Sequence, residues 1–214
     1  MKDIVQKLSF GICAVKINFH LLIPFSLCET KGINNYIHSF GIQTIADIKL
    51  NDIFDTNRIV IDYLSKMDFD AVIVNPFIGV TEMKKLVDYT HSKNMGVISL
   101  VHMSPLTANE GFGLSVIKES AAQQRKEMKM YELLLEYSIN SNVDGIVLGA
   151  THQDIIERVS SASNIPIYSP GFFVQGGKIQ NLDLNMMDYY IIGRYLINSH
   201  DPVLTLNEIL NKIN

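Results

Sequence analysis

Residues 71–101, AVIVNPFIGVTEMKKLVDYTHSKNMGVISLV, contain the pattern that indicates the fold class most clearly. A short β-branched run at 71–75 is followed by an amphipathic stretch and then by a second apolar run at 96–101. The short runs predict buried strands, and the longer stretch between them predicts a helix. A helix that joins two strands of this kind is typical of a parallel sheet covered by helices.

The same alternation of strand and helix extends along the whole chain. Segments predicted to be strands are residues 12–17, 43–48, 71–75, 96–101, 144–149, 165–169 and 189–193. Helix candidates follow them, for example residues 114–139, where apolar residues recur at helical spacing. No Pro-rich, Ser-rich or low-complexity segment marks a boundary, so residues 1–214 are predicted to form one domain.

This order of elements is compatible with two α/β folds, an open doubly wound sheet and a closed barrel of eight βα units. The barrel requires one strand more than the pattern provides. The first residues, MKDIVQKLSFG, read as a short amphipathic helix, and a βα barrel would place a strand before that helix. If the fold is a barrel, we therefore expect its first strand to be missing from this chain.

The charge and the apolar stretches of the chain indicate which kinds of partner to expect. The chain has 18 Lys and Arg against 22 Asp and Glu, a formal net charge of −4, which gives no reason to expect binding to nucleic acid or anionic membranes. The longest apolar stretch, residues 12–28, is interrupted by Lys16, Asn18 and His20, so it does not predict a membrane span. The N-terminus lacks the pattern of a signal peptide, so we expect a cytoplasmic protein with a small-molecule partner.

Several other residues receive no functional assignment. Cys13 and Cys28 have no CxxC spacing and are expected to be reduced, partly buried thiols. The six His residues show no metal-ligand spacing, so no metal is expected. The basic residues of the 114–139 segment are expected to form a solvated helix face: Lys118, Arg125, Lys126 and Lys129.

Charged residues follow two neighbouring predicted strands, where the active site of a parallel βα fold lies. Asp47 and Lys49, two residues apart, are expected to point the same way from their strand, and Asp52 follows in the loop. Lys16 ends the preceding strand and would project towards them. One Asp and one Lys would suggest a structural ion pair, but four alternating charges at adjacent strand ends favour a catalytic site.

A second signal follows the last two predicted strands. SPGFFVQGGK (residues 169–178) is rich in glycine, and Gly193 and Arg194 begin a helix. Glycines allow close backbone approach, helix N-termini favour anions, and Arg binds phosphate with two hydrogen bonds. Either loop alone could be an ordinary turn, but together they predict a phosphorylated ligand. Ser104, after the fourth predicted strand, either caps a turn or contacts the polar edge of a substrate.

These residues resemble those of a known family. DIKLNDI (residues 47–53) resembles the DxKxxD signature of the orotidine 5′-phosphate decarboxylase suprafamily. SPGFFVQGG and IIGR resemble the phosphate-binding segments of orotidine 5′-phosphate decarboxylase itself, nearest to its short archaeal type. The resemblance implies a homodimeric (β/α)8 TIM barrel, here without its first strand, that uses no metal or organic cofactor. It also implies conversion of orotidine 5′-phosphate (OMP) to UMP and CO2 in de novo pyrimidine biosynthesis.

The resemblance also implies residue roles. Lys49 would protonate C6 of the pyrimidine as the carboxylate leaves, Asp47 would lie beside that carboxylate, and Lys16 would connect Asp47 to the ribose. Asp52 would complete the charged array from the other subunit, and Thr56 would reach the ribose of the same neighbouring site. The remaining substrate-binding residues would be Ser104 at the pyrimidine amide edge, Gln175, Gly193 and Arg194 at the phosphate, and Pro170 and Gly176 beside them.

The sequence departs from the family at three places. The family's first strand ends in an Asp that contacts the ribose, and this sequence has neither that strand nor that Asp. After Ser104 the family often continues with HPG, whereas this chain has Pro105, Leu106 and Thr107. Asn75 stands where many relatives have His.

Three alternative functions remain open from the sequence. A 3-keto-L-gulonate 6-phosphate decarboxylase shares DxKxxD but uses Mg2+, and Ile53 and the Gln-Gly-Gly segment argue against it. A non-catalytic binder of phosphate ligands is suggested by the missing strand, although all four charges are present. A phosphosugar isomerase on the same fold would need a Glu or His base at a strand end, and none is well placed.

Overall fold

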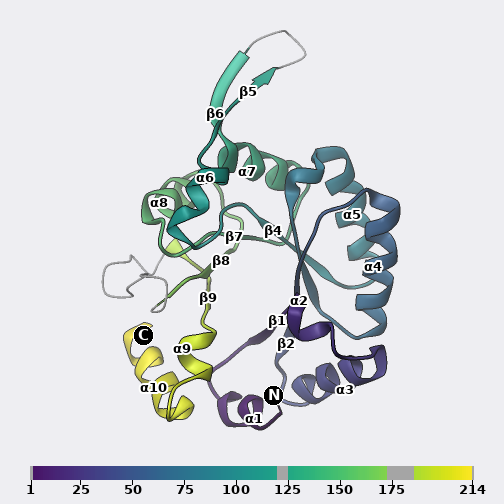
Figure 1. Ribbon diagram of the computed structural model, residues 1–214, viewed down its shortest axis with the longest axis vertical. Coiled ribbons are helices and arrows are strands. Elements are labelled where there is room, and N and C mark those ends of the chain that lie inside the picture. The colour runs from purple at the N-terminus through teal and green to yellow at the C-terminus, as the bar shows by residue number, and fades with distance from the viewer. Residues whose placement is uncertain (1, 120–124, 173–185, 214) are drawn as a thin grey trace.

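The computed structural model is an α/β barrel in which parallel strands curl around an axis and helices cover their outer side (Figure 1). The structure describes residues 2–119, 125–172 and 186–213. The sheet of seven strands has the order β1-β2-β3-β4-β7-β8-β9, and every neighbouring pair is parallel. The strands are β1 (Ala14–Asn18), β2 (Gln43–Leu50), β3 (Ala71–Val74), β4 (Gly96–Leu100), β7 (Gly145–Val147), β8 (Ile167–Pro170) and β9 (Tyr189–Ile191). Each coincides with a strand predicted from the sequence.

Helices connect the strands. The longer ones are α1 (Lys2–Leu8), α3 (Leu27–His38), α4 (Phe54–Lys66), α5 (Val80–His91), α7 (Met130–Asn140), α8 (Gln153–Ala162) and α10 (Pro202–Ile213). Short turns of helix lie in the loops: α2 (Phe19–Leu22), η1 (Pro76–Ile78), η2 (Leu106–Ala108), α6 (Asn109–Phe112) and α9 (Arg194–Ile197). Local sequence explains where they begin. At α3, for example, Ser26 and Glu29 form a capping box, in which each side chain accepts a hydrogen bond from the other residue's backbone N–H.

β1 and β9 are the two edge strands of the described sheet. Among the described residues, no strand pairs with the outer edge of β1 or of β9, and α1 packs beside α10 (Figure 1). Gly11 lies so close to α10 that a Cβ there would come within 2.8 Å of the Leu210 side chain. The short amphipathic helix expected at the N-terminus is therefore confirmed, and the described barrel has seven strands, as the sequence pattern indicates.

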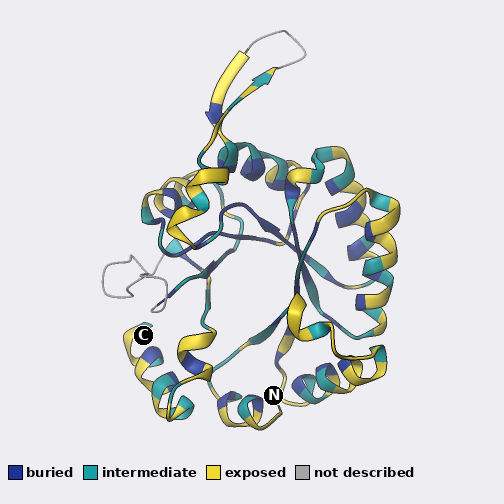
Figure 2. Ribbon diagram, viewed as in Figure 1, coloured by how far each residue is buried: buried dark blue, intermediate teal, exposed yellow. Residues whose placement is uncertain are grey.

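Alternating strand residues pack into two separate apolar layers. Ile45, Ile73, Ile98, Leu100 and Val147 form a cluster with Tyr168 at its edge. Their strand neighbours, such as Ala46, Val72 and Ile146, belong to the larger cluster that includes the buried faces of the helices. Because successive strand side chains point to opposite faces, the smaller cluster fills the barrel interior and the larger one fills the space under the helices. Figure 2 shows this buried layer along the strands and the exposed outer helix faces.

The prediction of a helix over residues 114–139 is wrong. The first part of this segment is an antiparallel hairpin of β5 (Ser115–Glu119) and β6 (Arg125–Lys129), which projects from the barrel (Figure 1), and only α7 is helical. The stretch Ser115–Glu119 alternates exposed and half-buried residues, the period of a strand. Val116 pairs with Met128, which is buried, so one hairpin face packs inward.

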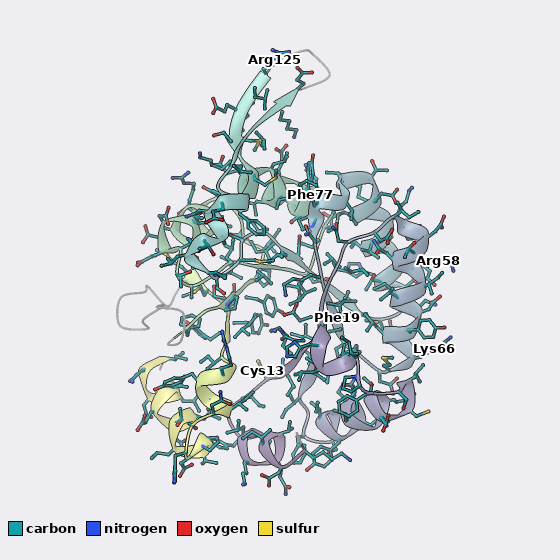
Figure 3. All side chains as sticks on the ribbon, viewed as in Figure 1. Cys13, Phe19, Arg58, Lys66, Phe77 and Arg125 are labelled. Carbon is teal, nitrogen blue, oxygen red and sulfur yellow. The ribbon has the colours of Figure 1, made fainter. Side chains whose placement is uncertain are left out.

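The basic residues expected on a helix face therefore belong to the hairpin. Lys118 forms an ion pair with Glu136 of α7, and Arg125, labelled near the hairpin tip in Figure 3, pairs with Glu119 at 2.8 Å. Lys126 and Lys129 are exposed, as expected. The buried face of α7 consists of Tyr131, Leu134, Leu135 and Ser138.

Removal of the hairpin is expected to leave the barrel folded. The Met130 amide donates to the Leu114 carbonyl at 2.8 Å, so the two ends of the hairpin lie side by side. Replacing residues 115–127 by two glycines keeps the buried Met128 and should change the free energy of unfolding by less than about 2 kcal/mol, because a two-stranded hairpin is only marginally stable. Urea denaturation followed by circular dichroism measures this. Failure of the shortened chain to fold would contradict it.

Cys13 and Cys28, expected to be partly buried, are both exposed; Cys28 lies outside the face of α3 that buries Thr30, Asn34 and Ile37. Within the described ranges, none of the helices combines the length and apolarity needed to cross a membrane.

Candidate active site

Lys16, Asp47 and Lys49 form one charged cluster where β1 and β2 end. The Lys16 ammonium lies 2.6 Å from Asp47 Oδ2, and the Lys49 ammonium lies 2.7 Å from Asp47 Oδ1. Parallel pairing of Asn18 with Asp47 holds the two strand ends together. Lys16 also donates to Asn18 Oδ1, a partner that sequence reasoning missed although it lies two residues along the same strand. The expected contact among these three charges is therefore present.

Lys49 reaches Asp47 through an irregular strand rather than a regular one. Ala46 pairs with Val72 and Leu50 with Val74, so four steps along β2 match two steps along β3. Lys49 lies in this bulge with a φ of +47°, a left-handed conformation that a residue with a side chain rarely adopts. Such backbone conformations cost about 1–3 kcal/mol and concentrate at functional sites, where the surrounding structure holds them.

Burial strengthens the electrostatic interactions between the three side chains of the cluster. The exposed fractions of the side chains are 6% for Asp47, 17% for Lys16 and 38% for Lys49. Burial by itself would raise the pKa of the Asp47 carboxyl, but the charge of Lys16 and the hydrogen bonds from both lysines outweigh it and lower that pKa. Burial lowers the pKa of Lys16, and attraction to Asp47 offsets this only in part. The cluster thus places one buried carboxylate between two lysine side chains.

Asp52 does not join this cluster within one chain. It is exposed in the loop after β2, where its carboxylate accepts a hydrogen bond from the Ile53 amide at 2.7 Å. Its carbonyl accepts from the Asn57 side chain at 2.6 Å, which fixes the start of α4. Thr56, one turn into α4, is exposed as well. The predicted group of four charges is therefore three charges in a single chain, with Asp52 facing outward.

The other predicted residues that the structure describes follow the carboxyl ends of further strands. Ser104 is buried after β4, Pro170 ends β8, and Gly193 and Arg194 begin α9 after β9. Gln175 and Gly176 lie outside the described residues. Because the seven strands of the barrel sheet are parallel, their carboxyl ends open onto one face of the barrel, so these residues share that face with the charged cluster.

Arg194 also lines a surface pocket. This pocket, of about 460 Å3, is formed by α9, α10 and the loop between them and includes Tyr195, Asn198, Ser199 and Thr205. It does not include Lys16, Asp47 or Lys49. The charged cluster locates the chemistry more specifically than the pocket does, because the pocket lining contains no carboxylate, lysine or histidine. Over the described residues no group of three His, Cys, Asp or Glu side chains could hold a metal ion.

Comparison with known proteins agrees with this geometry. A sequence profile described as the orotidine 5′-phosphate decarboxylase / HUMPS family matches residues 1–209. The chain belongs to this family. The resemblance seen in the DxKxxD and phosphate-binding segments is thereby confirmed.

Several relatives of this chain are archaeal proteins. A protein of Thermoplasma volcanium named orotidine 5′-phosphate decarboxylase is 30% identical over 97% of this chain and 84% of its own length. The enzyme of the same name from Methanocaldococcus jannaschii is 27% identical over 98% of this chain and 92% of its own length. The crystal structure of the M. jannaschii enzyme with the inhibitor BMP has a TM-score of 0.83 and 25% identity, covering 100% of this chain and 92% of that one.

Proposed function

We propose that this protein decarboxylates orotidine 5′-phosphate to UMP in de novo pyrimidine biosynthesis, without a metal or an organic cofactor. The observation that carries the proposal is the Lys16–Asp47–Lys49 cluster, with a buried carboxylate between two ammonium groups at the carboxyl ends of barrel strands. The relatives named above bear the name of this activity. The loss of orotate ultraviolet absorbance tests it directly.

The cluster can perform this chemistry with its own residues. The bond between C6 and the carboxylate carbon breaks, CO2 leaves, and the electron pair stays on C6. The Lys49 ammonium stabilises that developing negative charge and donates a proton to C6, and water returns the proton to Lys49. Asp47 lies beside the departing carboxylate, and repulsion between these two anions is relieved as CO2 forms. Lys16 holds Asp47 and reaches the ribose.

Substrate binding is assigned to the loops of the same face. Ser104 contacts the pyrimidine amide edge, and Arg194 and Gly193 hold the phosphate with the help of Gln175. Arg194 is exposed and begins α9, so its guanidinium is accessible to an anion. Pro170 and Gly176 complete the substrate-binding set. Phosphate binding far from C6 supplies energy that positions the pyrimidine against Lys49.

We further propose a homodimer in which Asp52 and Thr56 act in the partner's site. Large apolar side chains are exposed on the loops after β1, β2 and β3: Phe19, Leu21, Ile23, Phe25, Ile53 and Phe77. Figure 3 labels Phe19 and Phe77 among the side chains of these loops. Exposed apolar residues on neighbouring loops are typical of an interface, and the outward-facing Asp52 lies beside the exposed Ile53. The exposed thiols of Cys13 and Cys28 fit a reducing cytoplasm.

Mixing two inactive variants tests the shared site. Lys49→Ala and Asp52→Ala homodimers are both expected to be nearly inactive. After subunit exchange, half of the dimers are mixed and one of their two sites contains both native residues, so about a quarter of wild-type activity should return. Steady-state turnover of the mixture measures this. Absence of recovery, with exchange verified by native mass spectrometry, would show that Asp52 does not act across an interface.

A further inference from the structure

Three side chains hold three successive carbonyl groups of the segment that contains Ser104. The bonds run from His102 Nδ1 to Met103 O at 2.8 Å, from Thr151 Oγ1 to Ser104 O, and from His152 Nε2 to Pro105 O at 3.1 Å. A carbonyl oxygen only accepts, so each of these ring nitrogens carries a proton. Two of the three donors, Thr151 and His152, come from the loop between β7 and α8.

The loop between β7 and α8 also contacts the segment around Ser104 through its backbone. A Cβ at Gly149 would lie 2.4 Å from Ser104 Cα and 2.7 Å from Ser104 N, so only glycine permits this approach. The amides of Val101 and His102 both donate to the Val147 carbonyl at 3.1 Å. The ends of β4 and β7 therefore continue into two loops that touch along their backbones.

The two histidines form the buried centre of this contact. His102 is fully buried and His152 is 6% exposed, and their ring centroids lie 4.3 Å apart. Burial is the largest influence on His102 and lowers its pKa, which favours a neutral ring. His102 Nε2 lies 3.2 Å from the Asn109 side-chain amide, and the ring packs against Phe112 of α6. Most of the freedom of the segment around Ser104 is thus removed before a ligand arrives.

We propose that Thr151 and His152 are positioning residues that fix Ser104 for the pyrimidine amide edge. This inference rests on the proposed function, since it takes the ligand of Ser104 from it. Ser104 Oγ has no hydrogen-bond partner within the part of the chain that the structure describes, so its direction depends on the backbone that Thr151 and His152 hold. A hydroxyl directed in this way recognises a cyclic amide edge without having to be ordered on binding.

A double-mutant cycle tests this arrangement. Thr151→Val and His152→Phe each remove one donor and keep the volume, and each is expected to lower kcat/KM for OMP and the affinity for UMP about tenfold. In a Ser104→Ala background the same changes should cost less than about twofold, because Ser104 no longer contributes. Thr151→Ser, which keeps the donor, should retain near-normal values. Thr81→Val, on the exposed face of α5, serves as the matched control.

The possible outcomes distinguish the positioning role of Thr151 and His152 from the proposed function. Equal losses with and without Ser104, or no loss in the single variants, would overturn the positioning role while leaving the proposed function intact. Wild-type protein that binds UMP but does not turn over OMP would refute the proposed function, and the UMP affinities would still decide whether Thr151 and His152 act through Ser104. Wild-type protein that does neither would overturn both proposals.

Discussion

Lys49→Ala is expected to lower kcat for OMP decarboxylation by at least about 10³-fold, because it removes both the proton donor and the charge that stabilises the carbanion. UMP affinity should change by less than about threefold, since the phosphate and pyrimidine contacts remain. Asp47 would keep its ion pair with Lys16 at 2.6 Å, so the fold should persist. Stopped-flow or steady-state absorbance and calorimetric UMP titration measure the two quantities.

Lys84→Ala is the matched control for this experiment. Lys84 is exposed on α5, away from the strand ends, and its removal should leave turnover unchanged. If Lys49→Ala retained near-normal turnover, Lys49 could not be the proton donor. If it lost UMP binding together with turnover, its role would be binding rather than chemistry.

Asp47→Asn is expected to reduce both stability and turnover. Two ammonium groups would be left beside a buried neutral amide, and breaking a buried ion pair costs about 3–5 kcal/mol of unfolding free energy. Without the carboxylate, the burial that already lowers the pKa of Lys16 would act unopposed. Turnover should fall about 10²-fold or more, because Asp47 positions both lysines. Asp3→Asn, an exposed member of an i,i+4 pair, should change stability by less than about 0.5 kcal/mol.

The pH dependence of the difference in unfolding free energy between the wild-type protein and Asp47→Asn follows from the direction in which the pKa of Asp47 is shifted. The folded state lowers the pKa of Asp47, so its contribution is fully present above the ordinary value of 3.8 and is lost as pH falls through the lowered pKa. Urea denaturation of both proteins between neutral and acidic pH measures the difference in unfolding free energy. The two proteins should converge in acid. A difference that grows as pH falls would contradict the assignment of Asp47 as an ionised partner.

The sequence predicted the strands well because buried parallel strands are short, apolar and bounded by loops. It placed Lys16, Asp47 and Lys49 together because strand ends of one sheet share an edge. It failed at residues 114–139, where a hairpin rich in Lys and Glu has the composition of a solvated helix. The left-handed backbone of Lys49 depends on the match between β2 and β3, which no local pattern encodes.

Contacts between distant loops were also beyond the sequence. The hydrogen bonds from Thr151 and His152 to the segment around Ser104 join residues 47 positions apart, and no motif links them. The close approach of Gly149 to Ser104 could not be predicted either, because a glycine at a strand end usually indicates a turn. Asp52 lies in the loop after β2, as the sequence predicts, but its outward position depends on the loop that begins α4.

The most direct test of the central claim is the loss of orotate absorbance when the purified 214-residue chain is mixed with orotidine 5′-phosphate, with and without EDTA. We expect rapid loss of absorbance that EDTA does not affect, with UMP as the product. No loss of absorbance would contradict the proposed activity, and loss that EDTA abolishes would contradict a metal-free reaction at Lys49.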